Sequence, residues 1–307
     1  MTSQIGSTTA IARGFKPPYA GFPSTSTVAQ ALRPFPQFGT ISSLWAPLGD
    51  SYYDALQAML LKRFSRGIDA SVAYTWSKNL TNTYNEAGGS IFINDPFNRR
   101  NSISFSPNDQ PQVLAFGFGY QLPVFGLDRR SHFAGNVLRG WSLRGVFRYA
   151  SGLPIAVPTA QSNLNAYLFR NTTADRVPGV PLFTKNLNCH CFDPAKTLVF
   201  NPAAWVDPPT GQYGTSAPYY NDYRTQRQPS ENMNVARVWR REKFNVEFRV
   251  EFYNVFNRLQ LPGPSSGNPL ATTTYNSAGQ LTGGFGYING SSVGGMRNGQ
   301  AVIRVKF

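Results

Sequence analysis

The sequence is short of charged residues and of long apolar runs, and each shortage narrows the class of protein. Only 14% of its 307 residues are charged, against roughly 25% in an average soluble chain. No stretch approaches the roughly 18 to 20 apolar residues that a transmembrane helix requires. This excludes a helical membrane protein but not a membrane barrel, whose strands are apolar only at alternate positions. The first residues, MTSQIGSTTAIARGF, lack a basic segment followed by an apolar one, so we expect no signal peptide.

Cysteine and histidine are equally scarce. Cys189 and Cys191 flank His190, and the other histidine is His132. A structural zinc site takes four such ligands, so we expect no metal and no other cofactor. Two alternatives remain open for the cysteines: a tight disulfide in an oxidising compartment, or a pair of unused thiols.

Acidic residues are outnumbered by basic ones, 15 to 29, which gives a net charge of +14. Such a charge is typical of proteins that bind nucleic acid or an anionic surface. The cations are spread singly along the chain, without a basic block or an RNP-like motif, so we expect no nucleic-acid partner. We also expect no enzyme activity, because the chain lacks a metal-binding His motif and a P-loop. The acidic residues Glu247 and Glu251 fit a charge ladder with Arg249 better than an acid–base pair.

Aromatic residues, by contrast, are abundant at 14%, as are glycine and proline, and this composition favours an all-β protein with long loops. Segments of alternating apolar and polar residues predict the strands. They cover residues 52–64, 68–76, 112–122, 141–150, 233–239, 244–253 and 301–307. The first of them also fits a helix, but its neighbour favours a hairpin joined by the short turn 65–67.

The connections between these strands alternate in length. Short turns at 65–67 and 240–243 contrast with long loops at about 79–110, 155–230 and 258–296. Transmembrane barrels have this organisation, with short periplasmic turns and long extracellular loops. We therefore expect an antiparallel transmembrane β-barrel portion of about seven or more strands.

One strand face carries most of the charge, and the aromatic residues gather at strand ends. On a barrel, the charged face points into the lumen, and the predicted lumen-facing residues are Arg144, Arg148, Glu247, Arg249, Glu251, Arg304 and Lys306. The predicted aromatic girdles comprise Tyr52, Tyr53, Trp76 and Tyr149 at the extracellular ends and Tyr120, Trp141, Trp239, Phe244 and Phe307 at the periplasmic ends. The alternative is a soluble sandwich with one solvent face and an aromatic core.

Several segments resemble, in order, the Oar-like family of TonB-dependent outer-membrane transporters. They are SYYDALQAMLLKRFSRGIDASVAYTWSKNL, NDPFNRRNSISFSPNDQP, GWSLRGVFRYASGLPIAV, FNPAAW and NVEFRVEFYNVFN. The resemblance covers roughly residues 17–307. It implies a large outer-membrane barrel filled by a plug domain, an energy-coupling partner called TonB, and large or scarce substrates. It also implies that the terminal Phe307 is the signal read by the barrel-assembly machinery.

The chain departs from this family in several respects. It has no TonB box or plug, its strands are about a third of the family's number, and Asp109-Gln110-Pro111-Gln112 stands where the family often has Arg-His. We therefore expect the C-terminal portion of such a barrel, incomplete, at residues 49–307, after a loop or partial strand at 1–48. The expected partners are outer-membrane lipid, lipopolysaccharide, the assembly machinery, TonB and a missing plug. The alternative function is a soluble or surface all-β binding module, such as an adhesin or carbohydrate binder.

Overall fold

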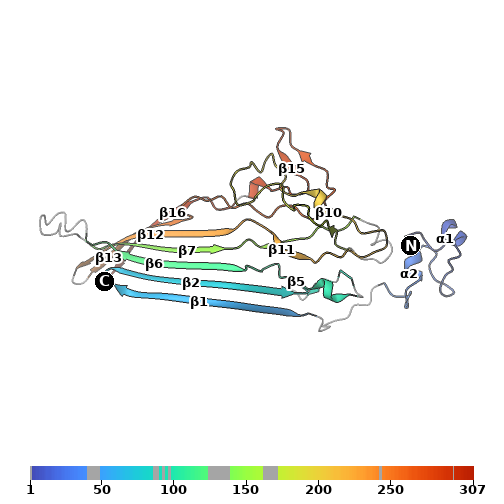
Figure 1. Ribbon diagram of the computed structural model, residues 1–307, viewed down its shortest axis with the longest axis horizontal. Helices are drawn as coiled ribbons and strands as arrows, with labels where there is room; N and C mark the ends of the chain where they lie inside the picture. Colours follow the sequence, from blue (N-terminus) through green and yellow to red (C-terminus); the bar gives the residue numbers. More distant parts are fainter. Residues whose placement is uncertain are drawn as a thin grey trace.

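One antiparallel sheet forms the body of the protein (Figure 1). The computed structural model describes residues 2–39, 49–85, 90–91, 94–95, 98–123, 139–161, 172–241, 244–292 and 294–307. In this part of the chain the strand order is β1-β2-β6-β7-β12-β13-β16, and the short strand β5 also pairs with β2. The all-β prediction is confirmed.

The strands of the main sheet follow one another with antiparallel pairing throughout. Their bounds are β1 (Ser51–Ser65), β2 (Ile68–Thr81), β5 (Ser104–Phe105), β6 (Gln112–Gln121), β7 (Trp141–Ala150), β12 (Gln228–Arg241), β13 (Phe244–Tyr253) and β16 (Asn298–Lys306). All seven predicted strands are present. The segment 52–64, which by its sequence also fits a helix, is a strand, and it pairs with β2 along its length.

The β1–β2 hairpin shows how the local sequence sets the register. Arg66 and Gly67 form its two-residue turn, with φ angles of 51° and 79°. Two successive positive φ angles define a type I′ turn, whose twist matches that of the strands it joins. Glycine suits the second position because a Cβ there would lie 3.0 Å from the carbonyl oxygen of Gln121 on β6. The turn pairs Ser65 with Ile68, and an irregularity between Lys62 and Ser65 shifts the register of the rest of the hairpin by one residue.

Short and long connections separate to opposite ends of the sheet, as predicted. Residues 66–67, 122–140 and 242–243 connect strands at one end, and residues 82–111, 151–227 and 254–297 connect them at the other. We call these the turn end and the loop end. The predicted turn 240–243 is too long, because Arg240 and Arg241 belong to β12 and pair with β13. Residues 242–243 lie outside the described part of the chain, as do parts of the longer connections.

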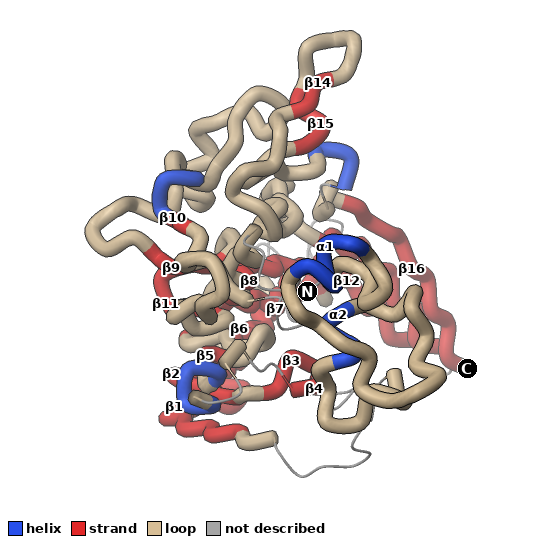
Figure 2. Tube along the Cα trace, turned by 90° about the vertical axis from the view of Figure 1, so that its right-hand side faces the viewer, coloured by secondary structure: helices blue, strands red, loops and turns tan. Residues whose placement is uncertain are grey.

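The sheet does not close on itself. Seen along the strands it is an open arc, with β1 and β16 at its two margins (Figure 2). Each of these margin strands has a pairing partner on one side only among the described residues. The fold is thus an open, incomplete barrel, as the sequence predicts.

The loops at the loop end form a packed layer, which we call the loop cap: residues 151–161, 172–227 and 254–292. Its short strand pairs are β8 (Pro154–Ala156) with β11 (Tyr219–Arg224), β9 (Asp175–Arg176) with β10 (Trp205–Val206), and β14 (Thr274–Tyr275) with β15 (Leu281–Gly283). A further pair, β3 (Thr83–Asn85) with β4 (Ser90–Ile91), lies in the β2–β6 connection. Short 3-10 helices cover Arg99–Ser102, Pro202–Ala204 and Gly290–Ser292.

The largest hydrophobic core lies in this cap and not in the sheet. Tyr223 is fully buried among the rings of Phe183, Phe200 and Trp205, at centroid distances of 5.4, 5.0 and 5.5 Å. Phe285, from the β13–β16 loop, packs on Phe200 at 5.2 Å. Two loops that are far apart in sequence therefore share one core, and aromatic burial of this kind contributes most of the local stability.

The N-terminal residues 2–39 form a separate small unit next to the loop end (Figure 1). It contains α1 (Thr8–Ala12) and α2 (Val28–Ala31), capped by the side chains of Ser7 and Thr27. Its own core comprises Ile5, Ala10, Phe22, Val28 and Ala31. No helix in the described residues is long and apolar enough to cross a membrane. The predicted boundary at residue 48 remains a prediction, since residues 40–48 lie outside the described part.

Candidate functional site

The predicted lumen charges all lie on one face of the sheet, which we call the polar face. One row of directly opposed residues crosses it from β2 to β16: Asp69, Gly119, Arg144, Asn234, Glu251 and Gln300. Arg148, Glu247, Arg249, Arg304 and Lys306 occupy neighbouring rows of the same face. The structure thus brings the seven predicted residues together, although their contact with a lumen remains a prediction.

The charges on β13 form the predicted ladder. Arg249 lies 2.8 Å from the carboxylate of Glu251 and 3.6 Å from that of Glu247. Gln300 on β16 donates a hydrogen bond to Glu251 as well. In the described part of the chain, no ion pair engages Arg144, Arg304 or Lys306. The polar face therefore carries both matched charges and cations that remain available.

Small residues make this face hollow. Ser71, Gly117 and Gly145 line a cavity of about 450 Å³ between Asp69 and Arg144, which extends to β12 and β13. A Cβ on Gly119 would lie 2.5 Å from the carboxylate of Asp69, so this glycine leaves room for the Asp69 side chain.

The opposite face of the sheet, which we call the apolar face, is exposed. One of its rows reads Tyr120, Leu143, Val235, Val250 and Ala301. Leu60 and Ile303, near the two margins, are 71% and 70% exposed. In a soluble sandwich a second sheet of similar size would cover this face, but the other sheets among the described residues have only two short strands each. Exposure of a broad apolar face fits lipid contact better than the sandwich alternative.

Most predicted girdle residues lie on the apolar face near its ends. Tyr52, Trp76 and Tyr149 lie toward the loop end, and Tyr120, Trp141, Trp239 and Phe244 toward the turn end. Tyr53 does not share this face with Tyr52, because neighbouring strand residues point to opposite sides. It pairs with Asn79, and both side chains lie on the polar face. Phe307 follows the last strand residue, Lys306, and is 99% exposed.

Two charged residues of β12 lie on the apolar face, and each is covered by a partner. Glu231 is 1% exposed, and both of its carboxylate oxygens accept hydrogen bonds from Nε of Arg258, at 2.8 and 3.0 Å. The guanidinium of Arg237 stacks over the ring of Trp239 at 4.4 Å. Such partners reduce the cost of charge near lipid. The sequence predicts this strand only from residue 233, because Pro229 and Glu231 interrupt the apolar alternation, whereas β12 begins at Gln228.

A buried ion pair anchors the loop cap to the sheet. Nη2 of Arg224, in the cap, lies 2.6 Å from Oδ2 of Asp109, which is part of the β2–β6 connection. Oδ1 of Asp109 accepts a hydrogen bond from the backbone of Asn79 on β2, and Gln110 accepts one from Arg148. The Asp109-Gln110 sequence therefore links the cap to the sheet.

Within the cap, burial and pairing perturb two titratable groups. Burial raises the pKa of the Tyr223 phenol above its ordinary value, and its hydroxyl has no hydrogen-bond partner among the described residues. The pKa of Arg176 is also raised, chiefly because its guanidinium donates hydrogen bonds to both carboxylate oxygens of Asp222, at 3.1 and 2.6 Å. The carboxylate of Asp222 is thereby occupied within the cap.

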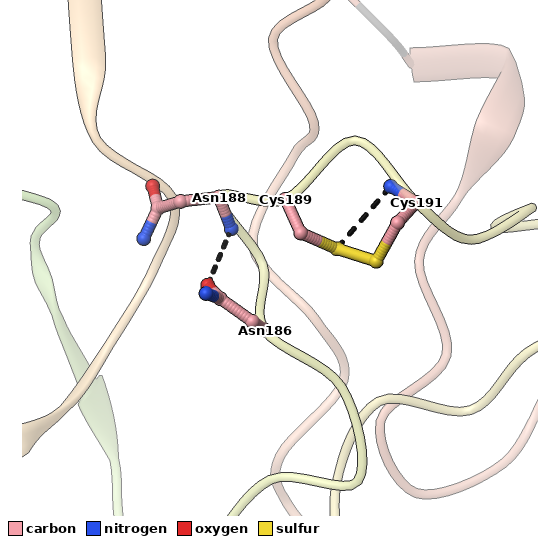
Figure 3. Close-up of a disulfide and its surroundings, with 4 residues drawn as sticks. All are labelled: Asn186, Asn188, Cys189 and Cys191. Atoms are coloured by element: carbon pink, nitrogen blue, oxygen red, sulfur yellow. Dashed lines mark hydrogen bonds between the residues drawn. A yellow bond between two sulfur atoms is a disulfide. The ribbon is translucent and has the colours of Figure 1, made fainter.

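The two cysteines form the disulfide that the sequence left as one of two alternatives. Cys189 and Cys191 are joined on either side of His190, and the preceding Asn188 donates its backbone N–H to the side chain of Asn186 (Figure 3). The described residues contain no cluster of three metal-ligating side chains. His132 lies outside them.

One further sequence motif has the spacing of a catalytic serine. Residues 290–294 read GSSVG, the G-x-S-x-G spacing of a nucleophile elbow. That motif needs a strand-to-helix turn and a histidine base. Here Ser292 ends an exposed 3-10 helix in a loop and accepts a hydrogen bond from Asn289. Neither the local structure nor the contacts of Ser292 fit a nucleophile.

An antiparallel sheet with an apolar face, a hollow polar face and long loops at one end only is the architecture of an outer-membrane β-barrel protein. A model of the outer membrane beta barrel domain family matches residues 6–300. The chain therefore belongs to this family and is an outer-membrane barrel protein. Neither the search of curated proteins nor the search of solved structures found a match.

Proposed function

We propose that this chain is the C-terminal part of the barrel of an Oar-like TonB-dependent transporter. It serves the uptake or passage of large or scarce substrates through the outer membrane. The proposal rests on the five family-like segments, which occur in the family's order, and on membership of an outer-membrane barrel family. In this proposal the chain performs no covalent chemistry and needs no cofactor.

The observation that carries the proposal is the hollow polar face with cations left over. Arg144, Arg304 and Lys306 have no ion-pair partner among the described residues, although Arg144 lines the cavity. Unpaired charges need water or an opposite charge. A plug domain with acidic residues would supply that charge and would fill the hollow that the glycines leave open.

The remaining partners follow from the ends of the barrel. At the loop end, the loop cap presents the surface that would meet substrate first. At the turn end, the exposed Phe307 would be read by the barrel-assembly machinery, and TonB would act on the plug from the same side. The basic excess would balance the plug or bind lipopolysaccharide phosphates.

Photo-crosslinking from two adjacent positions of β7 tests this function. A photoreactive amino acid replaces Arg144 on the polar face or, as the matched control, Leu143 on the apolar face. In outer membranes that also contain a co-expressed plug domain of an Oar-like transporter, position 144 is expected to crosslink to plug-domain peptides identified by mass spectrometry, and position 143 to lipid. Crosslinking of position 144 to lipid, or the same products from both positions, would refute the transporter proposal.

A further inference from the structure

A cavity of about 610 Å³ lies where the apolar face meets the loop cap. Its floor includes one complete row of directly opposed residues on four neighbouring strands: Tyr74, Leu114, Tyr149 and Pro229. This row belongs to the same face as the stacked rings of Phe116 and Phe147. The floor is thus the loop-side margin of the surface that contacts lipid.

The opposite wall comes from the loop cap and is cationic. His190, Arg227 and Arg258 line it. Arg258 is already engaged by Glu231. Arg227 is exposed, and in the part of the chain that the structure describes its guanidinium has no acidic partner. One strong cation therefore remains available at the cavity.

Arg227 also lines a second cavity of about 540 Å³, together with Lys185 and Asp222. Asp222 is paired with Arg176, so it does not neutralise the other two. The side-chain oxygen of Asn188 accepts the backbone N–H of Arg227 at 2.9 Å. The side-chain oxygens of Asp222 and Asn188 thus already accept hydrogen bonds from within the protein. The guanidinium of Arg227 and the ammonium of Lys185 are free to donate to a ligand.

Residues 186–191, which follow Lys185 and contact the backbone of Arg227, are held in place. The disulfide between Cys189 and Cys191 closes a short ring around His190, and the Asn186–Asn188 hydrogen bond supports its entrance (Figure 3). Because Asn188 in turn holds the backbone of Arg227, the ring and the cation form one preorganised wall. Preorganisation lowers the entropic cost of binding a ligand.

We propose that this cavity binds the phosphate group of an anionic glycolipid of the outer leaflet, with Arg227 as the principal donor. A ligand in the cavity meets apolar side chains on one side and a guanidinium on the other, so it must be both amphipathic and anionic. Guanidinium donors match phosphate oxygens in geometry and charge. Tyr74 and the girdle residue Tyr149 would lie at the depth where headgroups meet acyl chains. This inference rests on the lipopolysaccharide contact proposed above, which it assigns to one site, and it does not depend on transport.

The test uses the full chain in phosphatidylcholine nanodiscs and measures bound diphosphoryl lipid A by native mass spectrometry. Arg227→Gln is compared with Arg13→Gln, which removes the same charge from the N-terminal unit. Arg227→Gln should weaken lipid A binding about fivefold, the contribution of one cation near a charged surface. Arg13→Gln should leave it unchanged, and Arg227→Lys should restore most of it.

Two further arms identify the source of the phosphate. Dephosphorylated lipid A should bind the unsubstituted protein as weakly as lipid A binds the Arg227→Gln variant. Inorganic phosphate should compete only weakly, because it gains nothing from the apolar floor. Equal loss in both glutamine variants, or none in Arg227→Gln, would overturn the site. Strong competition by inorganic phosphate would overturn its assignment to a lipid. Amide exchange in the cap shows whether Arg227→Gln leaves it folded.

Discussion

Removing the guanidinium of Arg224 should release the loop cap from the sheet while leaving the sheet itself intact. In Arg224→Ala, the carboxylate of Asp109 would lose its partner at 2.6 Å. The Asp109 side chain is 1% exposed and that of Arg224 12%, so water does not readily replace the lost contact. The variant also loses the hydrogen bonds from Arg224 to the carbonyl oxygens of Asp109 and Gly152.

The size of the effect follows from this burial. Deleting one partner of a buried ion pair costs about 3–5 kcal/mol, because a charge remains buried without compensation. Here Asp109 keeps the hydrogen bond from the backbone N–H of Asn79 at 2.8 Å, which favours the lower limit. A loss of about 3 kcal/mol corresponds to roughly a hundredfold rise in the population of the open cap, at 1.4 kcal/mol per factor of ten.

Amide hydrogen exchange in the full chain measures this opening directly. Exchange should accelerate in β8 and β11, which belong to the cap, and stay unchanged in β6 and β7. Lys196→Ala is the control, because Lys196 and Asp193 form an exposed pair at 3.9 Å. Pairs of this kind contribute about 0–1 kcal/mol. If Arg224→Ala and Lys196→Ala had the same small effect, the Asp109–Arg224 pair would not anchor the cap.

Three more predictions concern single features. Tyr223→Phe removes a buried phenol whose pKa is raised in the folded state. Because the unfolded phenol ionises at a lower pH, the wild-type cap should lose stability as the pH rises above about 10, and the variant should lose less. Proteolysis of the cap between pH 8 and 11 measures this difference. Reduction of the disulfide, or the double change Cys189→Ser and Cys191→Ser, opens a short ring and should destabilise residues 186–192 by about 1.5 kcal/mol. Amide hydrogen exchange should accelerate at these residues only. Deletion of Phe307 should impair outer-membrane insertion, whereas Phe307→Tyr should not; normal insertion of the deletion variant in a membrane-fractionation assay would contradict its role as assembly signal.

Strand positions and faces were predictable because alternation is a local property. In β13, large apolar residues alternate with polar ones, and in β16 Val302 interrupts the pattern, so the sequence predicts which face most side chains take. The register that places Glu247 opposite Arg304 comes from the tertiary structure. The start of β12 was not predictable in this way. Pro229 and Glu231 occupy apolar-face positions, and their identity hides the alternation. Only the contact between Glu231 and Arg258 explains why a carboxylate is stable there.

The loop cap could not be predicted from sequence, because its contacts are not local. Phe183, Phe200, Tyr223 and Phe285 form one aromatic core, but they lie in irregular segments without a common period. The partner of Asp109 is likewise Arg224, on another loop. Composition indicated long loops, and only the tertiary fold shows that they pack.

The direction of the margin strands limits what can close this barrel. All six pairings from β1 to β16 are antiparallel, so the two margin strands run the same way. Bilayer hydrocarbon does not tolerate unpaired strand edges. Antiparallel closure therefore requires an odd number of further strands between β16 and β1. A second copy of the same sheet, its axis parallel to the first, would place β16 beside β1 in parallel and could not complete the pattern. Cysteines at Ala55 and Val302 would test this: disulfide crosslinks between copies in the membrane would contradict closure by additional antiparallel strands.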